Sequence, residues 1–132
     1  ILSEENNIVI TQKDIRNVQL AKGAIQAGCE ILLKKAGIGL NDINSIKIAG
    51  VFGKYIHVSQ AMNFGLFPKY PEKLEIVGNA AGDGAAMALF EDGFIDEMEK
   101  QVKKVHHVEL AGEKDFQKKF MNAMELKEWY YN

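Results

Sequence analysis

Apolar residues recur at helical spacing after Thr11, which predicts one long helix that ends near Ala36. Thr11 and Asp14 have the spacing of a capping box, in which each side chain binds the backbone amide of the other residue. Gly37 follows the last helical residue and is expected to adopt the left-handed conformation that ends many helices. The face predicted to be buried is an apolar stripe of Ile15, Val18, Ile25, Cys29, Leu32 and Ala36.

Beyond this helix, short β-branched runs alternate with helical stretches and glycine-rich turns. Strands are predicted over residues 7–10, 45–49, 74–77 and 105–110, and further helices over residues 58–65, 82–91, 94–103 and 114–126. This alternation indicates a layered α/β fold, and because no linker divides the chain, it predicts a single domain over residues 1–132. Since the first residue is not Met and the chain begins just before a predicted strand, we expect it to be a piece of a longer protein.

The composition of the chain argues against nucleic-acid binding and against a membrane-spanning segment, and it leaves the predicted fold unchanged. The chain has 132 residues, of which 47% are hydrophobic and 26% charged, so it can form a hydrophobic core. A formal net charge of -2 argues against nucleic acid as a partner, and no apolar run approaches the ~20 residues of a membrane span. The single cysteine, Cys29, can form neither an internal disulfide nor an iron–sulfur cluster by itself, which favours a reducing, cytoplasmic setting.

Two predicted strands end in glycine-rich junctions, and these are the main candidates for ligand binding. The first is Ala49-Gly50-Val51-Phe52-Gly53, and the second is Gly78-Asn79-Ala80-Ala81-Gly82-Asp83-Gly84. Glycine has no Cβ and permits positive φ, so backbone amides there can approach a base, a ribose or a phosphate. Ligands of open α/β sheets gather at the carboxyl ends of strands, although ordinary tight turns would carry the same glycines. Neither junction has the P-loop or the dinucleotide-binding pattern.

Other reactive side chains give no pattern of a catalytic or metal site. His106 and His107 are neighbours on a predicted strand, where they would face opposite sides of the sheet and could not share an ion. Cys29 is expected to be a small buried hydrophobe. Asp83 is expected to stabilise the start of a helix, with a magnesium role left open because it is the one carboxylate inside a glycine junction. We therefore predict no catalytic residue and no metal site in this chain.

The order of these parts resembles the second lobe of the actin, heat-shock chaperone and sugar-kinase ATPases. In that superfamily a long helix precedes a strand that runs into a glycine-rich adenosine motif, and a small-residue helix containing Gly-Ala-Ala follows. Here SIKIAGVFG and NAAGDGAAMAL occupy those places. Ala49 replaces the first glycine of the usual motif and Phe52 its small residue, which points to a narrower family. The blocks ITQKDIRNVQLAKGAIQAG, IAGVFGKYI, AMNFGLFP and VGNAAGDGAAMAL are similar to the carboxyl-terminal lobe of the reductive activators of corrinoid proteins.

That resemblance implies a ribonuclease-H-like lobe with a mixed sheet and flanking helices. Members of the family are iron–sulfur ATPases that use ATP with magnesium and return corrinoid proteins of methyltransferase systems to the Co(I) state. Arg16 and Gln19 would be weaker candidates for contact with the adenine edge. The resemblance implies that adenosine binds between the two junctions, at Ala49, Gly50, Val51, Phe52, Gly53, Gly78, Asn79, Gly82, Asp83 and Gly84.

The same resemblance implies that this chain lacks the iron–sulfur cluster and that it binds other proteins. The iron–sulfur cluster would lie in a domain outside this chain, because the family's cluster-binding cysteines are absent from it. This chain alone should therefore not hydrolyse ATP. The implied partners are a corrinoid protein, the remaining lobes of the same ATPase and, as a further candidate, a second copy in a homodimer.

Two other functions stay open on the sequence. One is another enzyme of the superfamily, such as a small-molecule kinase or a radical-dehydratase activator, although the latter would need a cluster-binding cysteine at its subunit interface. The other is a non-enzymatic docking or oligomerisation module, in which the glycines serve only the turns. Nucleotide binding by the intact parent protein separates the docking module from both kinds of enzyme.

Overall fold

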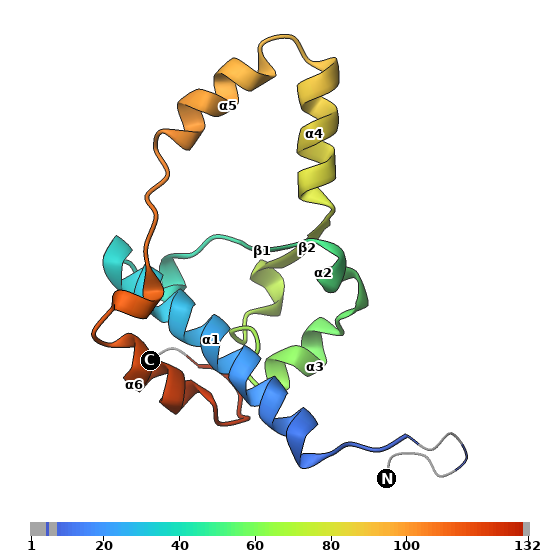
Figure 1. Ribbon diagram of the computed structural model, residues 1–132, viewed down its shortest axis with the longest axis vertical. Helices are drawn as coiled ribbons and strands as arrows, with labels where there is room; N and C mark the ends of the chain where they lie inside the picture. The colour runs from blue at the N-terminus through green and yellow to red at the C-terminus, as the bar shows by residue number, and fades with distance from the viewer. Residues whose placement is uncertain (1–4, 6–7, 131–132) are drawn as a thin grey trace. The chain divides into compact units, whose positions relative to one another are not determined.

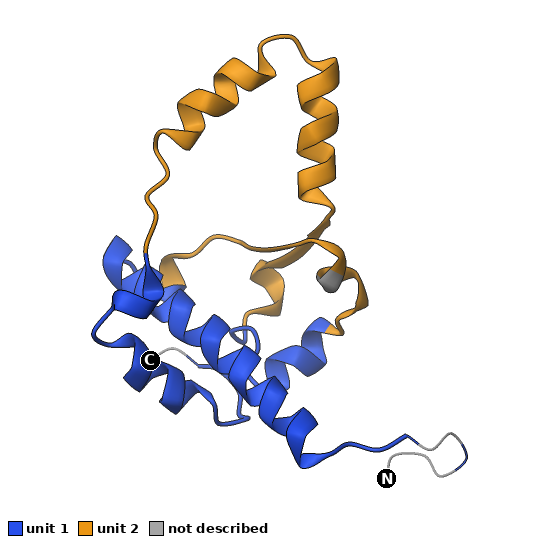
Figure 2. Cartoon of the chain, viewed as in Figure 1, with its two compact units in different colours: residues 1–40, 58–69, 109–132 blue, residues 41–57, 70–108 orange. Residues whose placement is uncertain are grey.

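The computed structural model describes residue 5 and residues 8–130, apart from the side chain of Phe52 (Figure 1). The chain divides into two compact units, each made of separate segments (Figure 2). The first unit comprises residues 1–40, 58–69 and 109–132, and the second comprises residues 41–57 and 70–108. The single domain expected over residues 1–132 stays a prediction, and the units are described one at a time.

The first unit is built on α1 (Gln12–Ala36), whose ends are set by local sequence. The Thr11 hydroxyl accepts a hydrogen bond from the Asp14 amide at 3.2 Å, and the Asp14 carboxylate accepts one from the Thr11 amide at 2.8 Å. Gly37 ends the helix in the left-handed conformation, with φ of 68°. The predicted capping box and the predicted glycine cap are both confirmed, because each depends on neighbours within a few residues.

Helix α6 (Phe116–Ala123) runs alongside α1 and packs closely against it (Figure 1). A Cβ added to Gly23 would lie 3.2 Å from both the Met124 Cγ and the Phe120 carbonyl oxygen, so the absence of a side chain there lets the two helices approach. Ala27 and Ile31 are also buried. The small residues of α1 thus define its packed face.

The prediction that the apolar stripe forms the buried face of α1 is wrong. The four large members, Ile15, Val18, Ile25 and Leu32, are exposed, and Cys29 and Ala36 are exposed as well. Helix α6 occupies the face marked by Gly23 and Ala27 instead, because small residues there permit close helix packing. Helical periodicity identifies an apolar face, but it does not identify which segment covers that face.

Lys22 joins α1 to the end of α6 from inside the first unit. Its side chain is 1% exposed, and its ammonium donates hydrogen bonds of 2.7 Å to the carbonyl oxygens of Ala123 and Glu125. Burial, followed by the charge of Lys127, lowers the pKa of Lys22. Gly65 lies against this lysine, and a Cβ added to Gly65 would meet the Lys127 carbonyl oxygen at 2.1 Å. These contacts hold the chain after α6 against the segment that follows α3 (Val58–Asn63).

The described part of the carboxyl-terminal segment packs back on the rest of the first unit. Trp129 is 3% exposed and forms an isolated parallel bridge with Pro68. The Lys69 amide donates a hydrogen bond of 3.2 Å to the Trp129 carbonyl oxygen, and the Lys69 ammonium pairs with the Glu128 carboxylate. Tyr131 and Asn132 of the same tail lie outside the described residues.

The second unit contains a two-stranded parallel sheet of β1 (Ile46–Ala49) and β2 (Leu74–Gly78). The register aligns Ile46 with Leu74 and Ala49 with Gly78, with one irregularity after Ile48. Its helices are α2 (Val51–Tyr55), α4 (Ala80–Phe90) and α5 (Phe94–Val102). The α/β class is therefore confirmed, and over the described residues the sheet is parallel, whereas a mixed sheet was expected.

The strand predicted over residues 105–110 does not form, and of the one predicted over residues 7–10 the described residues show a bridge at Ile8 alone. Residues 105–109 are irregular and lead into a single 3₁₀ turn at Leu110–Gly112, and Val9 and Ile10 are likewise irregular. Asn7, the first residue of the other predicted strand, lies outside the described residues. A strand requires a partner for its backbone groups, and the run at residues 105–110 acquires no neighbouring strand within the described part of the chain. Without a strand at 105–110, the predicted opposite orientation of His106 and His107 does not apply, and both are exposed.

Candidate functional site

The parallel pairing of β1 and β2 brings the two glycine junctions together at one end of the sheet. Ala49 is aligned with Gly78, so both strands end at the same edge, and α2 and α4 follow from there (Figure 1). The Gly50 amide donates a hydrogen bond of 2.6 Å to the Gly78 carbonyl oxygen. The sequence prediction that both junctions lie at the carboxyl ends of strands is thus confirmed, and the structure adds that the two strands are neighbours.

Gly50 and Gly78 are required by backbone conformation, and the space around them is open. Gly50 has φ of 89° and ψ of 175°, a region that is essentially restricted to glycine. Gly78 has φ of 68°. A Cβ added to either residue would meet no atom of the described chain within 4 Å. The backbone at both positions is therefore open to a ligand on the side where a Cβ would lie.

Gly53 packs against the sheet, which the sequence did not predict, and its expected contact with adenosine stays a prediction. Its missing Cβ points at the sheet, where it would lie 2.9 Å from the Ile48 Cγ2 and 3.4 Å from the Ile76 Cγ2. Gly53 is buried and lets the short helix α2 rest directly on the two strands. It therefore supports the first junction by packing. Ala49 and Val51 are exposed beside it, and the Phe52 side chain lies outside the described residues.

The second junction begins α4 through a side-chain cap. The Asn79 Oδ1 accepts a hydrogen bond of 3.3 Å from the Gly82 amide, and Asp83 follows in the first turn. A Cβ added to Gly82 would lie 2.2 Å from the Asn79 Nδ2, so Gly82 is small because the cap folds over it. Because of this cap, α4 begins at Ala80, two residues before the predicted start.

The remaining members of the junction face solvent. Asp83 is exposed, as expected of an acid that stabilises a helix start, and Gly84 has open space at its Cβ position. Among the described residues, no three His, Cys, Asp or Glu side chains gather in a way that would hold a metal ion. The junctions can thus offer backbone amides and a helix N-terminus to a polar ligand, but they bring no acid–base pair together.

Arg16 and Gln19, the weaker candidates for the adenine edge, belong to α1 in the first unit. Arg16 is exposed and Gln19 is half-buried. The glycine junctions belong to the second unit. A role for either side chain at the junctions stays a prediction.

The first unit contains a pocket that the sequence did not indicate. It lies between α1 and α6 and is lined by polar side chains, four of them lysines. The pocket could not be located from the sequence, because its two walls are separated by most of the chain. The run Lys118-Lys119 was the one local signal of its basic character.

A family model described as the C-terminal domain of RACo, the ASKHA domain, matches residues 2–131. The chain belongs to this family. The ASKHA fold of the family agrees with the α/β architecture and with the resemblance noted in the sequence, so both expectations are confirmed. In this RACo-type domain, the paired glycine junctions stand at the carboxyl end of the sheet.

Named relatives of this RACo-type domain act on corrinoid proteins. It is 40% identical over 119 residues to the corrinoid activation enzyme RamQ of Eubacterium limosum, covering 89% of this chain and 20% of that protein. It is 28% identical over 124 residues to the [Co(II) methylated amine-specific corrinoid protein] reductase of Methanosarcina barkeri, covering 92% of this chain and 23% of that protein.

A solved structure supports the same family assignment. The reductive activator for corrinoid,iron-sulfur protein matches with a TM-score of 0.81 and 35% identity, over 90% of this chain and 19% of that one. The chain therefore spans about a fifth of the length of the relatives it matches. Over the part of the chain that the structure describes, no helix is long and apolar enough to cross a membrane.

Proposed function

We propose that this chain is the carboxyl-terminal nucleotide-binding lobe of an ATP-dependent reductive activator, which returns corrinoid proteins of methyltransferase systems to the Co(I) state. The observation that supports the nucleotide site is the juxtaposition of Gly50 and Gly78, both with positive φ and both open where a Cβ would lie. The relatives named for corrinoid activation support the wider role.

In this proposal, adenosine lies against the backbone of the two junctions. The open Cβ positions of Gly50 and Gly78 leave room for a flat base or a ribose at backbone distance. The N-terminus of α4, with the Asn79 cap, directs free amides toward the same end of the sheet. Ala49, Val51, Phe52, Gly82, Asp83 and Gly84 complete the proposed walls, and Gly53 contributes by supporting α2.

This lobe binds and orients the nucleotide, and the reacting groups come from elsewhere in the parent protein. Magnesium bound to ATP would neutralise phosphate charge, but the described residues offer no cluster of ligands for it. A protein-bound iron–sulfur cluster requires several thiolates, and the single Cys29 does not fit that requirement. We therefore assign no step of electron transfer and no cleavage chemistry to this chain.

Exposed apolar surface supports the idea that the remaining lobes of the ATPase pack on this one. Leu89 and Phe90, at the end of α4, are 80% and 86% exposed, and Val51 and Tyr55 of α2 are also strongly exposed. On α1, the stripe that includes Ile25 and Leu32 is exposed as well. Apolar surface of this extent is typical of surfaces that meet other protein. A lobe that supplies half of a nucleotide cleft would need such contacts.

Calorimetric titration of ATP and ADP, with magnesium, into the full-length parent tests the nucleotide site. The Gly50→Val variant should lose binding, because valine both strains the backbone and fills the open position beside Gly78. Gly37→Val is the matched control, since Gly37 also has positive φ and open space but caps α1 in the first unit. Full binding by the control and none by Gly50→Val would support the proposal.

Two results would contradict it. If the folded full-length parent binds no nucleotide, the chain is a docking module whose glycines serve only the turns. If ATP binds but a corrinoid protein does not stimulate its hydrolysis, the parent is another enzyme of the superfamily, such as a kinase. Stimulation by the corrinoid protein would support the activator.

A further inference from the structure

The pocket of the first unit has an excess of positive charge. Its volume is about 590 Å³, and it is lined by Gln26, Glu30, Lys34, Asp115, Lys118, Lys119, Asn122, Ala123 and Lys127. Four lysines and two carboxylates leave a formal charge of about +2 in a chain whose net charge is -2. The pocket is thus positively charged, although the chain as a whole has a negative net charge.

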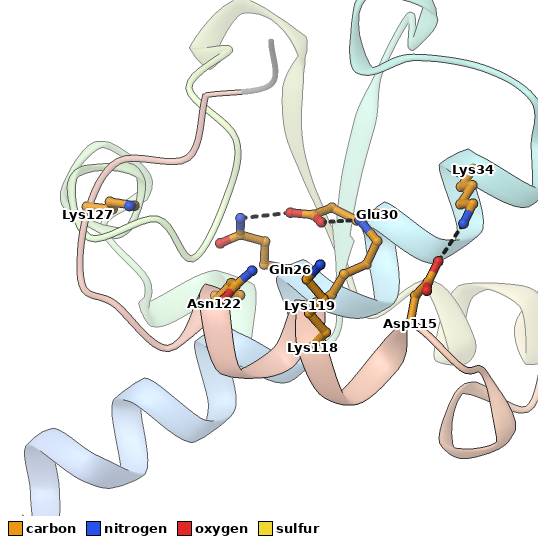
Figure 3. A pocket seen from close by; sticks show the side chains of 9 residues that line it. Gln26, Glu30, Lys34, Asp115, Lys118, Lys119, Asn122 and Lys127 are labelled. Carbon is orange, nitrogen blue, oxygen red and sulfur yellow. Dashed lines mark hydrogen bonds and ion pairs between the residues drawn. The ribbon is translucent and has the colours of Figure 1, made fainter.

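The carboxylates of the lining neutralise only two of the four lysines. The Lys119 ammonium lies 2.8 Å from the Glu30 Oε2, and the Lys34 ammonium lies 2.5 Å from the Asp115 Oδ2 (Figure 3). Lys127 pairs with Glu125, which does not line the pocket, and both side chains of that pair are well exposed. The Lys118 ammonium makes no ion pair and no hydrogen bond with any described residue.

Gln26 adds an acceptor that has no donor. Its Oε1 is buried without a hydrogen-bond partner among the described residues, while its Nε2 donates to the Glu30 Oε1 at 2.9 Å. That bond fixes the amide orientation, because a flipped amide would place oxygen against a carboxylate. The oxygen is thus covered by the packing of the first unit, while the Gln26 amide nitrogen is held by Glu30.

We propose that this pocket binds an acidic polypeptide segment of a partner protein. Lys127 and Lys34 lie at opposite ends of the pocket, with Lys118 and Lys119 between them, so the cations are spread along it (Figure 3). An extended segment with several carboxylates can meet charges spread in this way, whereas one small anion cannot. This interaction goes beyond nucleotide binding and does not depend on it.

The test uses this chain and a short fluorescein-labelled peptide of alternating Asp and Ser, with fluorescence anisotropy as the readout. The double variant Lys118→Gln/Lys127→Gln should raise Kd at least about fivefold, because it removes two exposed cations of the pocket. The matched control is Lys103→Gln/Lys104→Gln, which removes the same charge from the end of α5 in the second unit. The control should change Kd by less than about twofold.

A peptide with Asn in place of each Asp keeps the same length and shape but has no carboxylates, and it should not bind. Circular dichroism of each variant confirms that the fold is kept. Equal weakening by both double variants would overturn the proposal, since binding would then follow net charge alone. Displacement of the peptide by inorganic phosphate, at concentrations where chloride has no effect, would overturn it in favour of a small-anion site.

Discussion

The Gly50 amide donates a hydrogen bond to the Gly78 carbonyl oxygen, and the two atoms are 2.6 Å apart. This bond continues the pairing of β1 and β2 by one step beyond the last residue of β1. Both residues have positive φ, so two turns that only glycine adopts readily meet at one point. Because of this hydrogen bond, the backbone conformation of each junction depends on that of the other junction.

Gly50→Ala is expected to destabilise the fold by about 1–3 kcal/mol, because its φ of 89° and ψ of 175° are unfavourable for any side chain. Gly84→Ala is the contrasting variant, since Gly84 is inside α4 with open space at its Cβ position. It should stabilise the fold by about 0.5–1 kcal/mol. Urea unfolding followed by far-UV circular dichroism measures both changes. Equal effects of the two substitutions would contradict the conformational role of Gly50.

Ile31→Ala and Leu32→Ala compare two neighbouring side chains on α1. Ile31 is 3% exposed and Leu32 is 47% exposed. Loss of the buried side chain should lower the free energy of unfolding by about 2–5 kcal/mol, because a cavity remains. Loss of the exposed one should change it by less than about 0.5 kcal/mol. Thermal and urea unfolding of the chain give the comparison, and a larger cost at Leu32 would mean that its stripe is a packed face after all.

Lys22→Met tests the buried link between α1 and the end of α6. Methionine keeps an apolar stem of similar length, but the carbonyl oxygens of Ala123 and Glu125 lose their donor. We expect a loss of about 1–3 kcal/mol in unfolding free energy. Lys13→Met, at an exposed position of the same helix, should have almost no effect. Denaturant unfolding with Trp129 fluorescence as the probe is suitable, because the chain has one tryptophan and it is buried.

Asp14→Asn should remove part of the pH dependence of stability. Hydrogen bonds from the Thr11 side chain, and then from its backbone, lower the pKa of Asp14 below its ordinary value of 3.8. The folded state therefore favours the charged form, so this stabilisation is complete above the unfolded-state pKa. It is lost as the pH falls through the folded-state pKa.

Unfolding free energies measured from about pH 6 down to about pH 2.5 should fall less steeply for Asp14→Asn than for the unaltered chain. If the pH profile of Asp14→Asn matches that of the unaltered chain, the capping box contributes no pH-dependent stability.

Local features of the fold and the site were predictable from the sequence. The limits of α1 follow from Thr11, Asp14 and Gly37, which act on backbone groups within one turn of themselves. The strands at Ile46–Ala49 and Leu74–Gly78, and the glycine junctions after them, were also placed nearly correctly. The separate tasks of Gly50 and Gly53 were not predictable, because the packing of Gly53 on Ile48 and Ile76 exists only once the strands pair.

The sequence by itself determined where α1 begins and ends, where glycine permits unusual backbone, and which family the chain resembles. The tertiary structure alone decided which face of α1 is buried, whether the run at residues 105–110 pairs as a strand, and that Trp129 and Lys22 are interior. The physical reason is the range of the interactions. Caps and turns satisfy backbone groups among near neighbours, whereas burial and strand pairing depend on segments that are distant in the chain.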